Sequence, residues 1–81
     1  MLAIANKGLK FMNLWEVELN KELMIKNINV EDEELNSFLF SLGCYNGKTI
    51  TVVNRFKSNL VVVIKDARYS IDKQLAKAII V

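Results

Sequence analysis

The side chains that most often carry catalysis are scarce in this sequence. It contains no histidine, which excludes a Ser-His-Asp triad and any zinc site built with histidine. Its single cysteine, Cys44, has no second cysteine with which to form a disulfide or a metal site. The sequence also lacks a Gly-rich loop that would cradle a phosphate. We therefore predict that the chain is not an enzyme, has no catalytic residue and binds no cofactor.

An acidic run at Glu31–Glu34 is the one cluster of side chains that a hard cation such as iron would favour. Successive residues on a helix point around its axis rather than toward one centre. Acidic side chains near a helix N-terminus are already explained by their interaction with the helix dipole. We therefore predict no metal site here, and we interpret Cys44 as a small buried hydrophobe.

Aromatic and basic side chains outside the expected core are the candidates for contact with a partner. Phe40 lies about 140° around the predicted helix from Leu35, which places it off the apolar stripe. It is either a contact residue or is covered by the N-terminal residues through Leu9 and Phe11. A second candidate group is Arg55-Phe56-Lys57 at a hairpin tip, since Phe and Arg are favoured in interfaces. The alternative is a solvated tip. The complete candidate set is Phe40, Tyr45, Arg55, Phe56 and Lys57.

One helix, at about residues 31–42, must position Phe40. Its apolar stripe, with spacing i, i+3, i+4 and i+7, is Leu35, Phe38, Leu39 and Leu42. Gly43 stands where a helix commonly ends in a left-handed residue. The spacing therefore predicts that all four stripe residues belong to the core.

Short strands surround this helix in the sequence. Glu22–Val30 reads as a strand with a bulge near Lys26-Asn27, because its apolar residues change phase. Further strands are predicted at 48–54, 60–65, 69–71 and 79–81, the second of them apolar on both faces. Asn13 is expected to cap a helical turn, Asn20 to be left-handed, and Asp72 to cap a helical turn at about 73–77.

The length of 81 residues and a hydrophobic content of 52% indicate one small globular domain. We assign residues 13–81 to that domain and residues 1–12 to an N-terminal extension, for which a true start at Met12 is one explanation. No stretch is long enough to span a bilayer or to act as a secretory signal, so we expect a cytoplasmic protein without membrane insertion. Several short antiparallel strands favour a mainly β fold, a partly open barrel with the helix over one end.

The segment Leu35-x3-Leu39-x2-Leu42-Gly43-x3-Gly47-x2-Ile50-x-Val52, with the ending Leu75-Ala76-x2-Ile79-x-Val81, resembles the ferrous iron transport protein A (FeoA) family. The resemblance covers about residues 13–81. It departs from the family at three places: Asn20 replaces a glycine, Asn36-Ser37 replace arginines, and Ser58-Asn59-Leu60 replace the usual hairpin tip. The last two changes remove features that could meet a partner.

The resemblance implies an SH3-like barrel and a non-enzymatic accessory role in ferrous iron transport. The implied partner is the FeoB-type transporter, a membrane protein with a GTPase domain, contacted from the cytosolic side. The family is also linked to transition-metal binding, for which the residues above offer no site. The alternative is an SH3-like module of a regulator or nucleic-acid-binding protein, which would use the basic second half. That half carries seven Lys and Arg against two Asp, although only Arg55-Phe56-Lys57 resembles a nucleic-acid platform.

Overall fold

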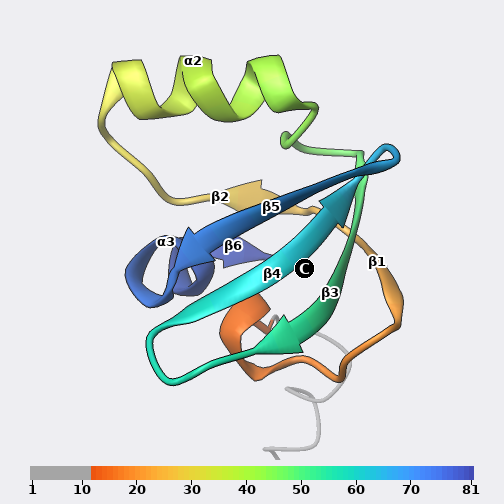
Figure 1. Cartoon of the computed structure of the whole chain (residues 1–81). Helices are drawn as coiled ribbons and strands as arrows, with labels where there is room; N and C mark the ends of the chain where they lie inside the picture. Colours follow the sequence, from red (N-terminus) through yellow and green to blue (C-terminus); the bar gives the residue numbers. More distant parts are fainter. Residues whose placement is uncertain (1–11) are drawn as a thin grey trace, which may run out of the picture.

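The computed structural model describes residues 12–81 (Figure 1). The predicted N-terminal extension lies, up to residue 11, outside the described residues. The elements in chain order are η1 (Leu14–Glu16), β1 (Glu22–Met24), β2 (Asn27–Ile28), α2 (Glu33–Leu42), β3 (Thr49–Arg55), β4 (Asn59–Ile64), β5 (Ala67–Asp72), α3 (Lys73–Ala78) and β6 (Ile79–Ile80). The predicted mainly β fold, with one inserted helix and a short C-terminal helix, is confirmed.

The strands form two antiparallel groups around one core. A four-stranded sheet has the order β1-β3-β4-β5, and a two-stranded ribbon pairs β2 with β6. In β3 the register shifts between Val52 and Asn54 where it pairs with β4, so the only irregularity of this ladder lies near the β3–β4 hairpin. Figure 1 shows α2 standing over one end of these strands and the β3–β4 hairpin at the other end.

The prediction of one bulged strand over Glu22–Val30 is wrong, although the phase change that prompted it is real. β1 pairs with β3, whereas β2 pairs with β6 in the other sheet. Between them the Ile25 amide donates to the Lys48 carbonyl (2.8 Å) and the Lys26 amide donates to the Ile80 carbonyl (2.7 Å). The chain therefore crosses from one sheet to the other at this point, which changes the phase without an extra residue.

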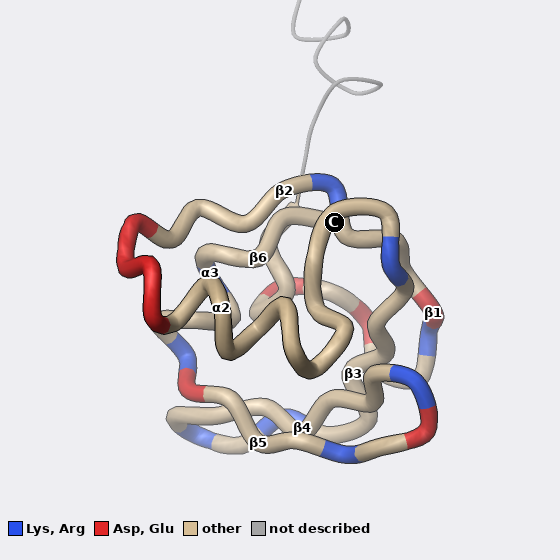
Figure 2. The backbone as a smooth tube through the Cα atoms, turned by 90° about the horizontal axis from the view of Figure 1, so that it is seen from above, with Lys and Arg blue, Asp and Glu red and all other residues tan. Residues whose placement is uncertain are grey.

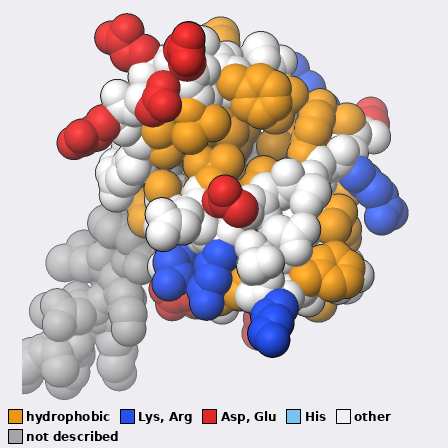
Figure 3. All heavy atoms as spheres, turned by 60° about the vertical axis from the view of Figure 1, so that its left-hand side comes forward, with side chains coloured by type: hydrophobic (Ala, Val, Ile, Leu, Met, Phe, Trp, Pro, Cys, Tyr) orange, Lys and Arg blue, Asp and Glu red, His pale blue; other side chains and the backbone are white. Residues whose placement is uncertain are grey.

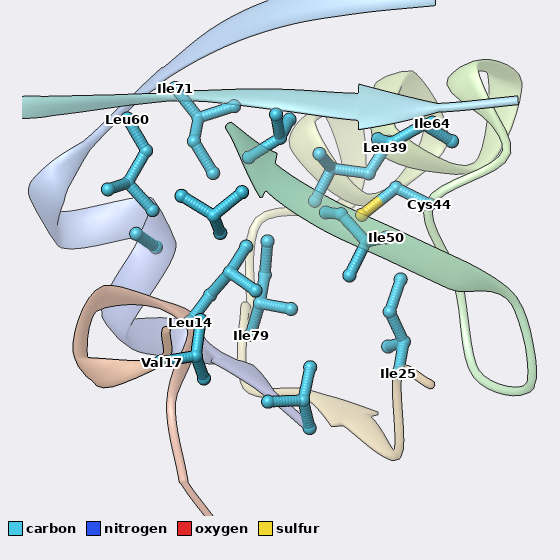
Figure 4. Packing of buried hydrophobic residues seen from close by; sticks show 14 residues of the cluster. Leu14, Val17, Ile25, Leu39, Cys44, Ile50, Leu60, Ile64, Ile71 and Ile79 are labelled. Atoms are coloured by element: carbon cyan, nitrogen blue, oxygen red, sulfur yellow. The ribbon is translucent and has the colours of Figure 1, made fainter. Parts of the chain in front are cut away.

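The core is entirely apolar within the described residues. Its largest fully buried side chains come from both sheets, α2, the turn η1 and the loops (Figure 4): Leu14, Ile25, Leu39, Cys44, Ile50, Val52, Leu60, Val62 and Ile79. No polar or charged residue of that range is buried. Burial of apolar surface therefore supplies the main stabilisation of this small domain.

α2 begins at Glu33, two residues later than the spacing predicts. The Asp32 side chain accepts hydrogen bonds from the Glu34 and Leu35 amides (2.9 and 3.2 Å), so Asp32 is the N-cap. Gly43 ends the helix with φ of 90°, a left-handed conformation that favours glycine. Leu39 is 2% exposed, as predicted, but Phe38 is 57% exposed, so its assignment to the core is wrong.

The central strand β4 is buried on one face only. Leu60, Val62 and Ile64 point into the core, whereas Val61 and Val63 are half-buried on the outer face. The prediction that this strand is covered on both faces is therefore wrong, since within residues 12–81 its outer face is only half-buried. β5 is also longer than predicted, running over Ala67–Asp72, and α3 extends to Ala78.

The first and last described residues lie side by side. Asn13 caps η1 by accepting from the Trp15 amide (3.0 Å), as predicted, and it also forms a bridge with Ile80. The Val81 amide donates to the Met12 carbonyl (2.8 Å). Asn20 has the predicted left-handed backbone, with φ of 62°. The N-terminal turn is thus fixed to the C-terminal strand.

Candidate interaction site

Arg55, at the end of β3, is held by the N-terminal turn. Its Nε donates to the Trp15 carbonyl (3.0 Å), and its Nη2 donates to the Val17 carbonyl. The guanidinium carbon also lies 5.9 Å from the centre of the Trp15 ring. These contacts use several hydrogen-bond donors of the guanidinium, so Arg55 connects the end of β3 to η1 and the residue after it.

Lys73, the first residue of α3, brings a second cation to the same indole. Its Nζ lies 5.0 Å from the centre of the Trp15 ring, within the range of a cation–π contact. Its amide donates to the Ser58 carbonyl in the β3–β4 hairpin (2.9 Å), which brings α3 against the hairpin tip. Phe56 is 50% exposed at that tip, and Lys57 is also exposed. This end of the molecule therefore combines an accessible ring with several cations.

Phe40 and Tyr45 form a separate aromatic pair at the C-terminal end of α2. Their ring centres are 4.5 Å apart and the planes differ by 28°, a stacked arrangement. The Nζ of Lys48 lies 5.4 Å from the centre of the Tyr45 ring. Phe40 is 63% exposed, so the helical geometry placed it correctly outside the core.

The five predicted contact residues do not form one surface. In Figure 1, α2 and the β3–β4 hairpin lie at opposite ends of the molecule, so Phe40 and Tyr45 are remote from Arg55, Phe56 and Lys57. The structure brings Trp15 and Lys73 to the hairpin, and the sequence did not indicate either of them. Trp15 lies 40 residues from Arg55 and 58 residues from Lys73 in the sequence, so no local spacing signals that these side chains meet.

In the described part of the chain, the remaining chemistry-bearing groups do not build a reactive centre. Burial raises the pKa of the Cys44 thiol to about 11, so this thiol stays protonated and unreactive at neutral pH. The acidic residues before and within the first turn of α2 form a continuous stretch in Figure 2. Across residues 12–81, no three acidic or cysteine side chains are placed to hold a metal ion. In the same range no helix is long and apolar enough to cross a membrane.

Solved structures share this fold. The crystal structure of an iron uptake regulatory protein (FeoA) has a TM-score of 0.74 and 22% identity, covering 86% of this chain and 92% of that one. The zinc complex of FeoA from Stenotrophomonas maltophilia, a prokaryotic SH3 domain protein, has a TM-score of 0.72 and 19% identity, covering 84% and 86%. A manganese-dependent transcriptional repressor has a TM-score of 0.77 and 22% identity, covering 89% of this chain but only 41% of its own.

The sequence itself identifies the family. No curated protein is a significant match to the chain. The model of the FeoA domain, however, matches residues 12–81, which is nearly the whole sequence and all of the described fold. The SH3-like architecture expected from the resemblance is the one that these neighbours share. The chain therefore belongs to the FeoA domain family, a family of non-enzymatic accessory domains associated with ferrous iron transport.

Proposed function

We propose that this chain is a small cytoplasmic accessory protein of ferrous iron uptake that acts by contact with a FeoB-type, GTPase-coupled ferrous iron transporter. The observation that carries the proposal is the match of the FeoA domain to residues 12–81. The described residues add exposed aromatic side chains and no group of metal ligands. These features favour a role in binding a protein over a role in carrying iron.

Two contact areas are proposed. One is the stacked pair Phe40 and Tyr45, which presents a rigid aromatic surface beside Lys48. The other is the hairpin tip, where Phe56 and Lys57 are exposed and Arg55 fixes the base of the hairpin. Aromatic side chains with neighbouring cations are typical anchors of protein interfaces.

The test is a titration of the isotope-labelled chain with the soluble cytosolic segments of the transporter, in each nucleotide state, followed by NMR. We expect amide shifts around one or both areas. Phe40→Ala and Phe56→Ala should each leave the fold intact and reduce affinity by about fivefold or more, roughly 1 kcal/mol, where the ring is an anchor. Met24→Ala, at an equally exposed position on β1, is the control.

Different results would contradict different parts of the proposal. Shifts confined to other surfaces would remove the two contact areas but leave the partner. Absence of binding to every transporter segment, in every nucleotide state, would remove the partner as well.

A nucleic-acid role is the second candidate, favoured by the cations around the hairpin and by the shared fold of the manganese-dependent repressor. Binding of this kind should weaken steeply between about 50 and 200 mM salt, because phosphate contacts release counterions. No binding of duplex or single-stranded DNA at low salt would exclude it.

A further inference from the structure

The apolar stripe of α2 is only partly covered by the rest of the molecule. Leu39 is buried, but Leu35 and Leu42 are half-buried and Phe38 is 57% exposed. Phe38 lies one turn after Leu35, so the two share one side of the helix. An amphipathic helix normally buries its whole stripe. Here the side of the stripe that carries Phe38 is left open. Phe38 lies about 160° around the helix from Phe40, so the two rings are on nearly opposite sides of α2.

A groove continues from this open side toward α3. Its apolar lining includes Val30, Leu35 and Leu75, which come from the segment before α2, from α2 and from α3. Its volume is about 360 Å³. The groove therefore has room for several side-chain ends.

The walls of the groove are fixed before any partner binds. The Asn29 amide donates to the Ala78 carbonyl (2.8 Å), which ties the segment before α2 to α3. The Asn36 side chain donates to the Val30 carbonyl (2.7 Å), which ties the same segment to α2. A preformed groove lowers the ordering cost of binding.

The rim of the groove is acidic. Glu31, Asp32 and Asp72 line it, and none of its lining residues is a lysine or arginine. Asp32 and Asp72 are held in place as the caps of α2 and α3. Within the described residues, none of these three carboxylates has an ion-pair partner. Figure 3 shows apolar side chains exposed beside the acidic cluster at the N-terminal end of α2.

We propose that this groove binds a peptide segment of a partner protein that carries apolar anchors flanked by several Lys or Arg residues. The apolar floor would take the anchors, and the carboxylates at the rim, which have no ion-pair partner among the described residues, would face the cations. An isolated cation would leave the apolar lining unused. This assignment rests on the proposed function in one respect: cytosolic loops of membrane proteins carry an excess of Lys and Arg close to the bilayer, so a membrane transporter supplies such segments.

The test uses the full chain and a defined probe. The probe is a fluorescein-labelled 18-residue helical peptide with Leu along one face and Lys on the other. Its matched counterpart has Glu in place of every Lys and the same apolar face. We expect the Lys peptide to bind with an anisotropy change that weakens as salt is raised, and the Glu peptide to bind at least tenfold more weakly. NMR shifts should cluster at residues 30–38 and 72–78.

Two pairs of variants distinguish binding in the groove from non-specific hydrophobic or electrostatic binding elsewhere on the surface. Phe38→Ser should weaken binding of the Lys peptide at least fivefold, whereas Met24→Ser, at a 56% exposed position on β1, should change it less than twofold. Glu31→Lys should weaken binding at least threefold at low salt. Glu22→Lys makes the same change of net charge away from the groove and should have less than half of that effect. Circular dichroism of each variant confirms that it is folded.

Several results would overturn the proposal. These are equal affinity for the two peptides, equal effects within either pair of variants, or shifts away from the groove. Concentration-dependent shifts at Phe38 without peptide would instead assign the groove to a second copy of the chain, and would also overturn it.

The transporter titration then distinguishes this inference from the proposed function. If the transporter segments bind and Phe38→Ser has no effect on their affinity, the groove assignment fails while the transporter role stands. If the Lys peptide occupies the groove but no transporter segment binds the chain, the groove stands and the transporter role fails.

Discussion

At the scale of single residues, burial decides the chemistry of Cys44. The side chain is 2% exposed, and burial disfavours its charged form, which raises the pKa of the thiol from near 9 to about 11. Well below pH 9 the thiol is protonated in both the folded and the unfolded chain, so it adds no pH dependence there. Between about pH 9 and 11 the unfolded chain loses this proton and the folded chain keeps it, so stability falls as pH rises.

We therefore expect a Cys44-specific loss of about 2 kcal/mol in the free energy of unfolding between pH 8.5 and 10.5. Urea unfolding of the natural chain and of Cys44→Ala, at several pH values, measures it. The two proteins differ only at residue 44, so the difference between the two curves isolates the thiol. Parallel curves would show that Cys44 titrates normally in the fold.

Arg55 has a structural role that its sequence-based interpretation did not include. Its contact with a partner stays a prediction, and in the structure it donates to the carbonyls of Trp15 and Val17. Arg55→Lys keeps the charge and loses the planar fork, so we expect a loss of about 1–3 kcal/mol in thermal or urea unfolding. Lys57→Ala, exposed two residues later, should change stability by less than about 0.5 kcal/mol. If Arg55→Lys and Lys57→Ala changed the stability equally, the hydrogen bonds of the Arg55 guanidinium would not stabilise the fold.

At the scale of elements, local signals were sufficient where a residue's role is local. The caps Asn13 and Asp72, the left-handed Asn20 and the helix end at Gly43 all follow from short-range chemistry. The spacing could not show that the chain leaves one sheet at Ile25 and joins another. A single bulged strand and a crossing between two sheets give the same change of phase in the apolar residues. Nor could the spacing show which side of the α2 stripe stays open, because that depends on where α3 lies.

The α2 stripe should therefore divide into two classes of residue. Leu39→Ala removes a fully packed side chain and should cost about 2–5 kcal/mol, enough to unfold a marginal domain. Phe38→Ala removes a mostly exposed ring from the same helix and should cost less than about 1 kcal/mol. Urea unfolding of both variants measures the contrast. A large loss for Phe38→Ala would show that its ring is packed.

At the scale of the whole molecule, we propose that the folded domain does not need residues 1–11. The described fold is already fixed at its first residues, because Asn13 caps η1 and Met12 pairs with Val81. The thermal midpoints of the full chain and of a chain beginning at Met12 should differ by less than about 5 °C. A difference equivalent to more than about 2 kcal/mol, many degrees for a domain of this size, would show that the removed residues pack on the core.

The hydrogen bond between Met12 and Val81 makes the described domain a candidate for circular permutation, in which the order of the elements along the chain is changed. The two ends nearly close the backbone into a ring, so a short glycine-serine linker from Val81 to Met12 would span them without strain. New termini could then be opened among residues 56–58, at the exposed hairpin tip. Such a circular permutant should reach the same native structure. The pairing of β3 with β4 would then join the two ends of the permuted chain, so it would carry the largest loop-closure entropy of the strand pairs.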